Sequence, residues 1–437
     1  MTFSPKEFIN RKRPYTGLFL FPFVLLSILQ GMAFHPRITA IEIKGNEKTL
    51  DYIIEREIQH RIGVPLDSTL AKADRNRLEN LGIFSDVEWF AIPLEDGTAI
   101  LSFRIMESIQ RTPPGLLPTY EEDTGWSLVG GWIIKNFRGR NQTLQLGGSI
   151  GGKDTYGLNF VDPWIFGNHI SFALNLGRSI YNHNFLERII SINSFKLGLG
   201  KWFGNNIKTS TGLKYERKTF SNDYNSSSFL YFVPDFSITY DTRDIYWNPS
   251  RGVRLSQYVY HMEGIQPQNY SLTFWRQSYS GFIKLNSKDE KLIFAVNTSI
   301  NRKWGDKDEF WLNYFGDSFT IRGWLLPTKN LYSSLKESWR FGHESIHATI
   351  ELRKDIIPKY VTSYGTEFGL GVVAFYDIGK IANDWQKLME ISSISGAGFG
   401  IRIPFPMIDV LRFDYGWGYR NGKWNSGAFH WGIQQKF

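Results

Sequence analysis

The chain has 437 residues with no cysteine, 34 phenylalanines, 21 tyrosines, 15 tryptophans, 41 glycines and a formal net charge of +8. The lack of cysteine excludes disulfides and thiolate metal sites, and the negative mean hydropathy of -0.28 excludes a helical membrane protein. The aromatic content excludes a disordered chain, and so dilute a charge does not indicate a nucleic-acid partner.

The first 33 residues have the three parts of a secretory signal peptide. Residues 11–13 (Arg-Lys-Arg) are basic, residues 17–29 (GLFLFPFVLLSIL) are an apolar core, and residues 31–33 (Gly-Met-Ala) offer a small-x-small cleavage site. The apolar core is shorter than the ~20 residues of a spanning helix. We therefore predict a signal peptide over residues 1–33, with a retained membrane anchor as the alternative.

Residues 34–108 have the pattern of one compact α+β unit. Asp51 is the expected N-cap of a first helix, and Gly82 is a suitable stop for a second. The predicted elements, in chain order, are a strand over 38–43, helices over 52–58 and 70–81, and strands over 87–92 and 99–105. The predicted order is β-α-α-β-β.

Two segments of this unit carry a family resemblance. Residues 41–46 (IEIKGN) and 81–87 (LGIFSDV), with the glycine-x-phenylalanine-x-x-valine spacing, resemble a polypeptide-transport-associated (POTRA) domain. The alternative is an unrelated small α+β domain. The resemblance implies an open strand edge that takes up an extended client peptide by strand addition.

The rest of the chain is predicted to be mainly β. Residues 109–124 contain three prolines and read as a linker. Residues 125–437 consist of short alternating runs, which at ~10 residues per tilted strand suffice for about sixteen antiparallel strands. The alternation is clearest in the runs 398–405, 411–418 and 429–437. An apolar outside and a polar or small inside is typical of a transmembrane β-barrel, whereas a soluble β-sandwich, the alternative, turns its polar face to water.

A long segment without alternation interrupts these strands. It separates the strands predicted at 291–300 and 345–352, and is too long for a hairpin loop, so we place a lumenal loop at about 306–342. A later strand directs Asp377 inward by its period of two, and an inward carboxylate requires a partner. The loop arginine, Arg322, has a planar fork of donors that suits this role.

The loop centre, residues 315–324, and the strand motif, residues 375–379, resemble those of the Omp85 superfamily of outer-membrane insertases and translocases. The resemblance implies that Arg322 meets Asp377, with Glu351 as a second acidic partner. The single POTRA unit leaves the subfamily open. The implied loop–strand contact residues are Ile321, Arg322, Gly323, Trp324, Glu351, Phe375, Asp377 and Gly379.

The same resemblance implies a function. The chain is expected to be an outer-membrane assembly factor with its POTRA domain in the periplasm, acting without cofactor or covalent chemistry on unfolded client polypeptides. The lipid bilayer and periplasmic chaperones or accessory proteins are further expected partners. Clients enter at a lateral seam between a first strand near 126–134 and a last strand at 429–437. The implied seam residues are Phe429, Trp431, Ile433 and Phe437. A secretion translocase and a passive channel are the alternatives.

One motif points to a different chemistry. Residues 343–347 (HESIH) match the H-E-x-x-H pattern of zinc proteases, which requires a helix so that two histidines one turn apart share a metal. Here the second half enters a predicted strand, where the two imidazoles would lie ~13 Å apart. We therefore predict no metal site and no enzyme.

Overall fold

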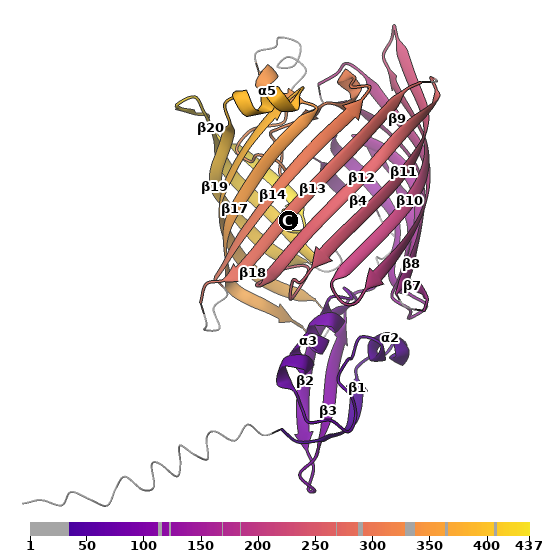
Figure 1. Cartoon of the computed structure of the whole chain (residues 1–437), viewed down its shortest axis with the longest axis vertical. Coiled ribbons are helices and arrows are strands. Elements are labelled where there is room, and N and C mark those ends of the chain that lie inside the picture. The colour runs from indigo at the N-terminus through magenta and orange to yellow at the C-terminus, as the bar shows by residue number, and fades with distance from the viewer. Residues whose placement is uncertain are drawn as a thin grey trace, which may run out of the picture.

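The computed structural model describes residues 35–111, 116–121, 124–167, 169–183, 185–267, 269–286, 292–327, 337–362, 366–405 and 409–437. The predicted signal peptide, residues 1–33, lies outside the described residues. A small α+β domain sits at one end of a large β-barrel (Figure 1). Among the described residues, no helix is long and apolar enough to span a membrane.

The small domain has the predicted β-α-α-β-β order. Its five elements are β1 (Ile38–Lys44), α2 (Asp51–Glu55), α3 (Ser68–Glu79), β2 (Phe84–Pro93) and β3 (Ala99–Glu107). The sheet order is β1-β3-β2, so β2 is an edge strand. Asp67 caps α3 by accepting hydrogen bonds from the backbone of Thr69 and Leu70. Asp51 is the first helical residue rather than the N-cap, because Leu50 takes the cap position.

The barrel is a closed antiparallel sheet. In chain order its strands are β4 (Leu116–Glu121), β5 (Gly125–Phe137), β6 (Gln142–Gly151), β7 (Lys153–Phe166), β8 (Ile170–Asn182), β9 (Ile189–Phe203), β10 (Ile207–Ser221), β11 (Ser226–Asp241), β12 (Gly252–Gln266), β13 (Ser271–Lys284), β14 (Leu292–Gly305), β17 (Glu344–Val361), β18 (Glu367–Ala382), β19 (Ile394–Phe405), β20 (Asp409–Arg420), β21 (Lys423–Trp424) and β22 (Ala428–Ile433). Of these seventeen segments in the described residues, β21 and β22 both pair with β20. β21 and β22 together occupy one strand position in the barrel wall, so sixteen strand positions surround the lumen in the described part of the chain.

Two predicted boundaries of the barrel are wrong. The segment predicted as part of a linker contains β4, which pairs with β5 from Leu116–Gly130 to Glu121–Gly125, so the first strand is not 126–134. Pro118 has no backbone N–H and so donates no hydrogen bond to a neighbouring strand. It is tolerated in β4, the first strand of the barrel. The last strand ends at Ile433 rather than Phe437, because Gln434 has a φ of 67° that breaks the extended backbone.

The strand pattern separates a lipid face from a lumenal face. In β18, Val372 and Tyr376 are exposed on the outside, whereas Phe375 and Asp377 are buried inside. The same alternation holds in β19 and β20. The apolar outer face suits acyl chains, and the polar inner face requires partners within the lumen.

The small domain contacts several of the short turns on one rim of the barrel. Asn80 donates to the carbonyl of Asp244 (3.0 Å) and accepts from the backbone N–H of Tyr246 (2.8 Å). The amide of Gln59 donates to Asn205 (2.8 Å). These contacts join the domain to the β9–β10 and β11–β12 turns, and so place it beneath the lumen, as seen in Figure 1.

Candidate functional site

The segment between β14 and β17 folds back into the barrel. It contains two short 3-10 helices, η1 (Glu309–Trp311) and η2 (Ser338–Arg340), and two short strands, β15 (Asn313–Tyr314) and β16 (Phe341–Gly342), which pair with each other. We call residues 320–324 the loop tip. The loop tip lies against the inner faces of β17–β20 and β22.

Arg322 is fully buried and binds three carboxylates. Its Nε and Nη2 donate to the two oxygens of Asp377 (2.8 and 3.0 Å), and its Nη1 donates to Glu351 (2.8 Å) and Asp414 (3.1 Å). The backbone N–H of Arg322 also donates to Asp377 (3.0 Å). The guanidinium lies 3.6 Å from the centre of the Phe375 ring. Such bidentate, charge-assisted contacts fix both the position and the orientation of the loop tip.

Inward-facing glycines make room for the loop tip. A Cβ on Gly396 would overlap the carbonyl oxygen of Arg322, and one on Gly418 would overlap the Trp324 ring. Gly379 has the same role for the loop, since a Cβ there would lie 2.9 Å from Cε2 of Phe315. The wall is therefore shaped to the loop rather than merely adjacent to it.

The loop-tip backbone is bound by residues near the end of the chain. Gly323, with a φ of 87°, donates its N–H to Nε2 of His430 (2.9 Å), and its carbonyl accepts from Nδ2 of Asn425 (2.7 Å). Lys436 Nζ donates to the carbonyl of Thr320 (2.6 Å) and lies 2.9 Å from Oδ1 of Asp377. The indole N–H of Trp324 donates to the carbonyl of Ser395 on β19 (2.8 Å).

The loop tip belongs to a larger buried charge cluster. The side chains of Arg353 and Arg402 contact Glu351, and those of Arg402 and Arg412 contact Asp414. The cluster thus contains three carboxylates and five cations, namely Glu351, Asp377, Asp414, Arg322, Arg353, Arg402, Arg412 and Lys436. Sequence reasoning missed Asp414, His430 and Lys436 as loop partners. The alternation of their strands predicts that Asp414 and His430 point inward, but it does not give their distance from the loop.

A second group of contacts holds the start of the loop at the end of the barrel away from the small domain. Trp311 packs among the rings of Phe220, Phe229, Tyr231 and Tyr270, with centroid distances of 5.9 to 6.2 Å. Phe310 stacks on Phe220 at 4.1 Å. We call this set of six rings the aromatic cap. It packs the start of the loop against the inner wall of β10, β11 and the residue before β13 through apolar contacts.

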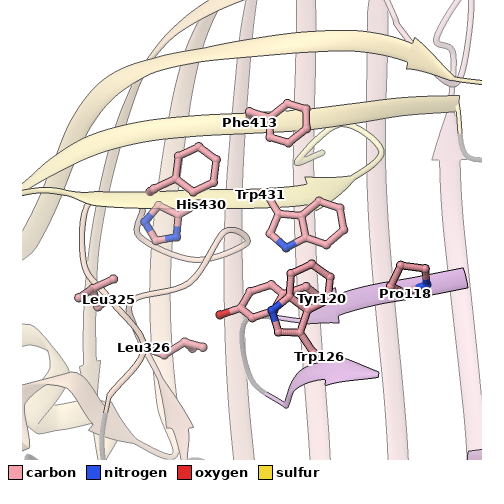
Figure 2. Close-up of a pocket in the computed structure, with 9 residues that line it drawn as sticks. Pro118, Tyr120, Trp126, Leu325, Leu326, Phe413, His430 and Trp431 are labelled. Atoms are coloured by element: carbon pink, nitrogen blue, oxygen red, sulfur yellow. The ribbon is translucent and has the colours of Figure 1, made fainter. Parts of the chain in front are cut away.

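The junction of the last and first strands has different properties from the rest of the wall. β22 and β4 are neighbours in the closed order, and β22 has six residues, whereas the strands from β5 to β20 that form the rest of the wall have 10 to 18. A cavity of about 780 Å³ lies there, lined by Pro118, Tyr120, Trp126, Leu325, Leu326, Phe413, Phe429, His430 and Trp431. Figure 2 shows aromatic rings from β4, β5 and β22 grouped around it. The Tyr120 and Trp431 rings meet across the junction at 6.5 Å.

The predicted seam residues do not all lie at this junction. Phe429 and Trp431 line the cavity, and Ile433 is the last residue of β22, exposed on the outside. Phe437 instead turns into the barrel beyond the end of the strand. Its ring lies 4.8 Å from the Arg353 guanidinium and 6.0 Å from the Phe282 ring.

The histidine pair of the zinc-protease pattern lies on a strand. His343 immediately precedes β17 and His347 is within it, packed edge-on against the Phe315 ring at 5.8 Å. Within the part of the chain that the structure describes, no three histidine, aspartate or glutamate side chains are grouped as metal ligands would be.

Comparison with known families assigns both parts of the chain. A family model described as the Omp85 superfamily domain matches residues 136–437. The POTRA family model, described as a surface antigen variable number repeat, matches residues 36–108.

Individual relatives are more distant. Outer membrane protein assembly factor BamA of Neisseria meningitidis serogroup B (strain ATCC BAA-335 / MC58) is 29% identical over 154 residues, which are 35% of this chain and 19% of the relative. The match thus spans about a fifth of that relative's length.

Solved structures share the fold at low identity. BamA from Haemophilus ducreyi lacking POTRA domains 1-3 has a TM-score of 0.56 and 17% identity, covering 90% of this chain and 84% of that one. CdiB from Acinetobacter baumannii has a TM-score of 0.51 and 15% identity, covering 92% and 73%. CdiB from Escherichia coli has a TM-score of 0.52 and 10% identity, covering 92% and 90%.

Proposed function

Because the chain belongs to the Omp85 superfamily, as a barrel in the outer membrane with one POTRA domain in the periplasm, we propose that it inserts client β-barrel proteins into that membrane. Membership of this superfamily indicates a function in protein insertion or translocation. The observation that carries the choice of insertion is the junction of β22 and β4, where the six-residue last strand meets β4 beside an apolar cavity.

The short last strand, β22, cannot match the bilayer. Six residues at about 3.3 Å each span about 20 Å along the strand, whereas the hydrocarbon core is about 30 Å thick and a tilted strand needs about 9–11 residues to cross it. Lipids beside the junction must therefore thin or disorder locally. Thinned lipid lowers the barrier for a client strand to enter at this point.

The same junction offers an edge to a client. When β22 and β4 separate, each exposes backbone N–H and C=O groups that an incoming strand pairs with. The cavity beside them, lined by Tyr120, Trp126 and Trp431, accepts apolar side chains of that strand. The POTRA domain brings the client, and its free edge β2 is a second place for strand addition. No step requires a cofactor or covalent chemistry.

The two alternatives both need a path through the lumen. A secretion translocase and a passive channel would each have to move the loop, which is held at two separate places, by Arg322 and by Trp311 in the aromatic cap. Sideways opening at the junction leaves both anchors in place, and this favours insertion.

Assisted folding in liposomes tests the proposal. The purified chain is reconstituted, an unfolded barrel protein from another family is added, and the rate at which it becomes protease-resistant is measured. Because the chain has no cysteine, a Tyr120→Cys, Trp431→Cys pair can be bridged across the junction as a matched control. We expect acceleration that is lost on bridging and restored by reduction. Acceleration that survives bridging would place client entry elsewhere, and none at all would favour a translocase or a channel.

A further inference from the structure

The end of the chain is connected to the loop as well as to the barrel wall. After β22 ends, residues 434–437 turn into the lumen and bring the Lys436 ammonium beside the loop tip. Its nitrogen is 2.6 Å from the carbonyl oxygen of Thr320 and 2.9 Å from Asp377, and the side chain is 2% exposed. Asp377 is therefore shared between Arg322 of the loop and Lys436 of the terminal segment.

The contacts of the loop tip divide into two sets. The side chain of Arg322 is bound by carboxylates on β17, β18 and β20. The backbone of Thr320 and Gly323 is bound by residues 425–436, through Asn425, His430 and Lys436. One of the strands that form the junction, β22, thus carries His430 on its inner face and leads directly to Lys436.

We propose that residues 425–436 form a latch, with His430 and Lys436 as positioning residues, which couples separation of the junction to release of the loop tip. This inference deepens the proposed function and rests on it for its biological use. When β22 shifts away from β4, His430 moves with it, and the pull on residues 434–437 draws Lys436 from Asp377 and Thr320. The loop tip then keeps its Arg322 contacts but loses the bonds that His430 and Lys436 make to the backbone of Gly323 and Thr320.

The charges in the cluster allow the latch to open without leaving a carboxylate uncompensated. Five cations face three carboxylates. When Lys436 leaves, Asp377 still holds both side-chain hydrogen bonds from Arg322. Removal of Arg322 would instead withdraw the contact that all three carboxylates share. Departure of Lys436 therefore breaks one ion pair of the cluster, whereas removal of Arg322 breaks three.

Hydrogen exchange of the loop-tip amides tests the latch without any client. Lys436→Met keeps the aliphatic stem and removes two charge-assisted hydrogen bonds. We expect amides in residues 320–324 to exchange about tenfold faster or more. Lys196→Met is the matched control, since Lys196 pairs with Asp235 (2.6 Å) on strands remote from the loop tip, and it should leave these amides unchanged. His430→Phe, which removes the acceptor for Gly323, should act in the same direction as Lys436→Met.

Bridging the junction tests the coupling. In the otherwise unaltered chain, the bridged Tyr120→Cys, Trp431→Cys pair should slow exchange in residues 320–324, and Lys436→Met should abolish that slowing. Equal loop-tip exchange with and without Lys436→Met and His430→Phe would overturn the latch, and so would a bridging effect that Lys436→Met leaves intact. If the latch results hold but assisted folding fails, the coupling stands and the proposed function falls.

Discussion

Arg322→Ala combined with Asp377→Ala gives the sharpest test of the loop site. The Arg322→Ala change removes two side-chain hydrogen bonds to Asp377 and one each to Glu351 and Asp414. Breaking a buried ion pair on one side costs ~3–5 kcal/mol. Because Lys436 remains on Asp377, we expect the lower end, ~3 kcal/mol of unfolding free energy, for Arg322→Ala.

Asp377→Ala should cost a similar amount, since it strips partners from both Arg322 and Lys436. The double variant removes the shared contact only once, so we expect ~4 kcal/mol rather than the additive ~6 kcal/mol. The coupling of ~2 kcal/mol exceeds the ~0.5 kcal/mol within which independent sites add.

Urea unfolding in lipid vesicles, followed by tryptophan fluorescence and by heat-modifiable gel mobility, measures these free energies. Rates of assisted client insertion are measured on the same samples. The control cycle uses Lys196→Met and Asp235→Asn, a pair whose lysine is 35% exposed and for which we expect a coupling of ~0–1 kcal/mol. Additive losses for Arg322 and Asp377 would refute the reasoning, because they would show that the two side chains do not act as one contact.

Three further changes probe other parts of the molecule. Gly396→Ala should expel the loop tip, because its Cβ overlaps the Arg322 carbonyl, and should make the loop protease-sensitive; Gly177→Ala, whose nearest neighbour is 3.8 Å away, should not. Trp311→Ala should raise single-channel conductance in planar bilayers by opening the aromatic cap; unchanged conductance would mean that other groups close the mouth. Asn80→Ala removes two hydrogen bonds to the β11–β12 turn and should loosen the POTRA domain by ~1–2 kcal/mol, seen as faster proteolysis after residue 108; equal cleavage would show that this contact does not hold the domain.

The barrel architecture could be predicted from the sequence because each strand shows the alternation of inward and outward residues within its own segment. Alternation with a period of two is visible in each strand, and Asp377 could be directed inward on parity alone. The need of an inward Asp377 for a partner indicated Arg322, which the family resemblance supported, whereas Glu351 as a second partner came from the resemblance alone.

What the sequence could not supply was register and the ends of strands. Asp414 joins the Arg322 site only because β19 and β20 bring it opposite Gly400, and no local pattern gives that offset. The run 429–437 predicts one continuous strand, whereas the positive φ of Gln434 ends the strand and turns Lys436 toward the loop. The prolines of residues 113–118 indicated a linker, although one of them lies within β4.

The aromatic cap bears on two requirements of such a barrel, namely a wall that can open sideways and a lumen that stays closed to solutes. A wall that parts sideways would leak detergents, bile salts and antibiotics if its lumen were also open to the outside. Trp311 packs among its neighbouring rings at the end of the barrel away from the small domain, and the proposed sideways opening does not involve these contacts. We therefore expect the permeability of the lumen to be the same whether the junction is open or shut.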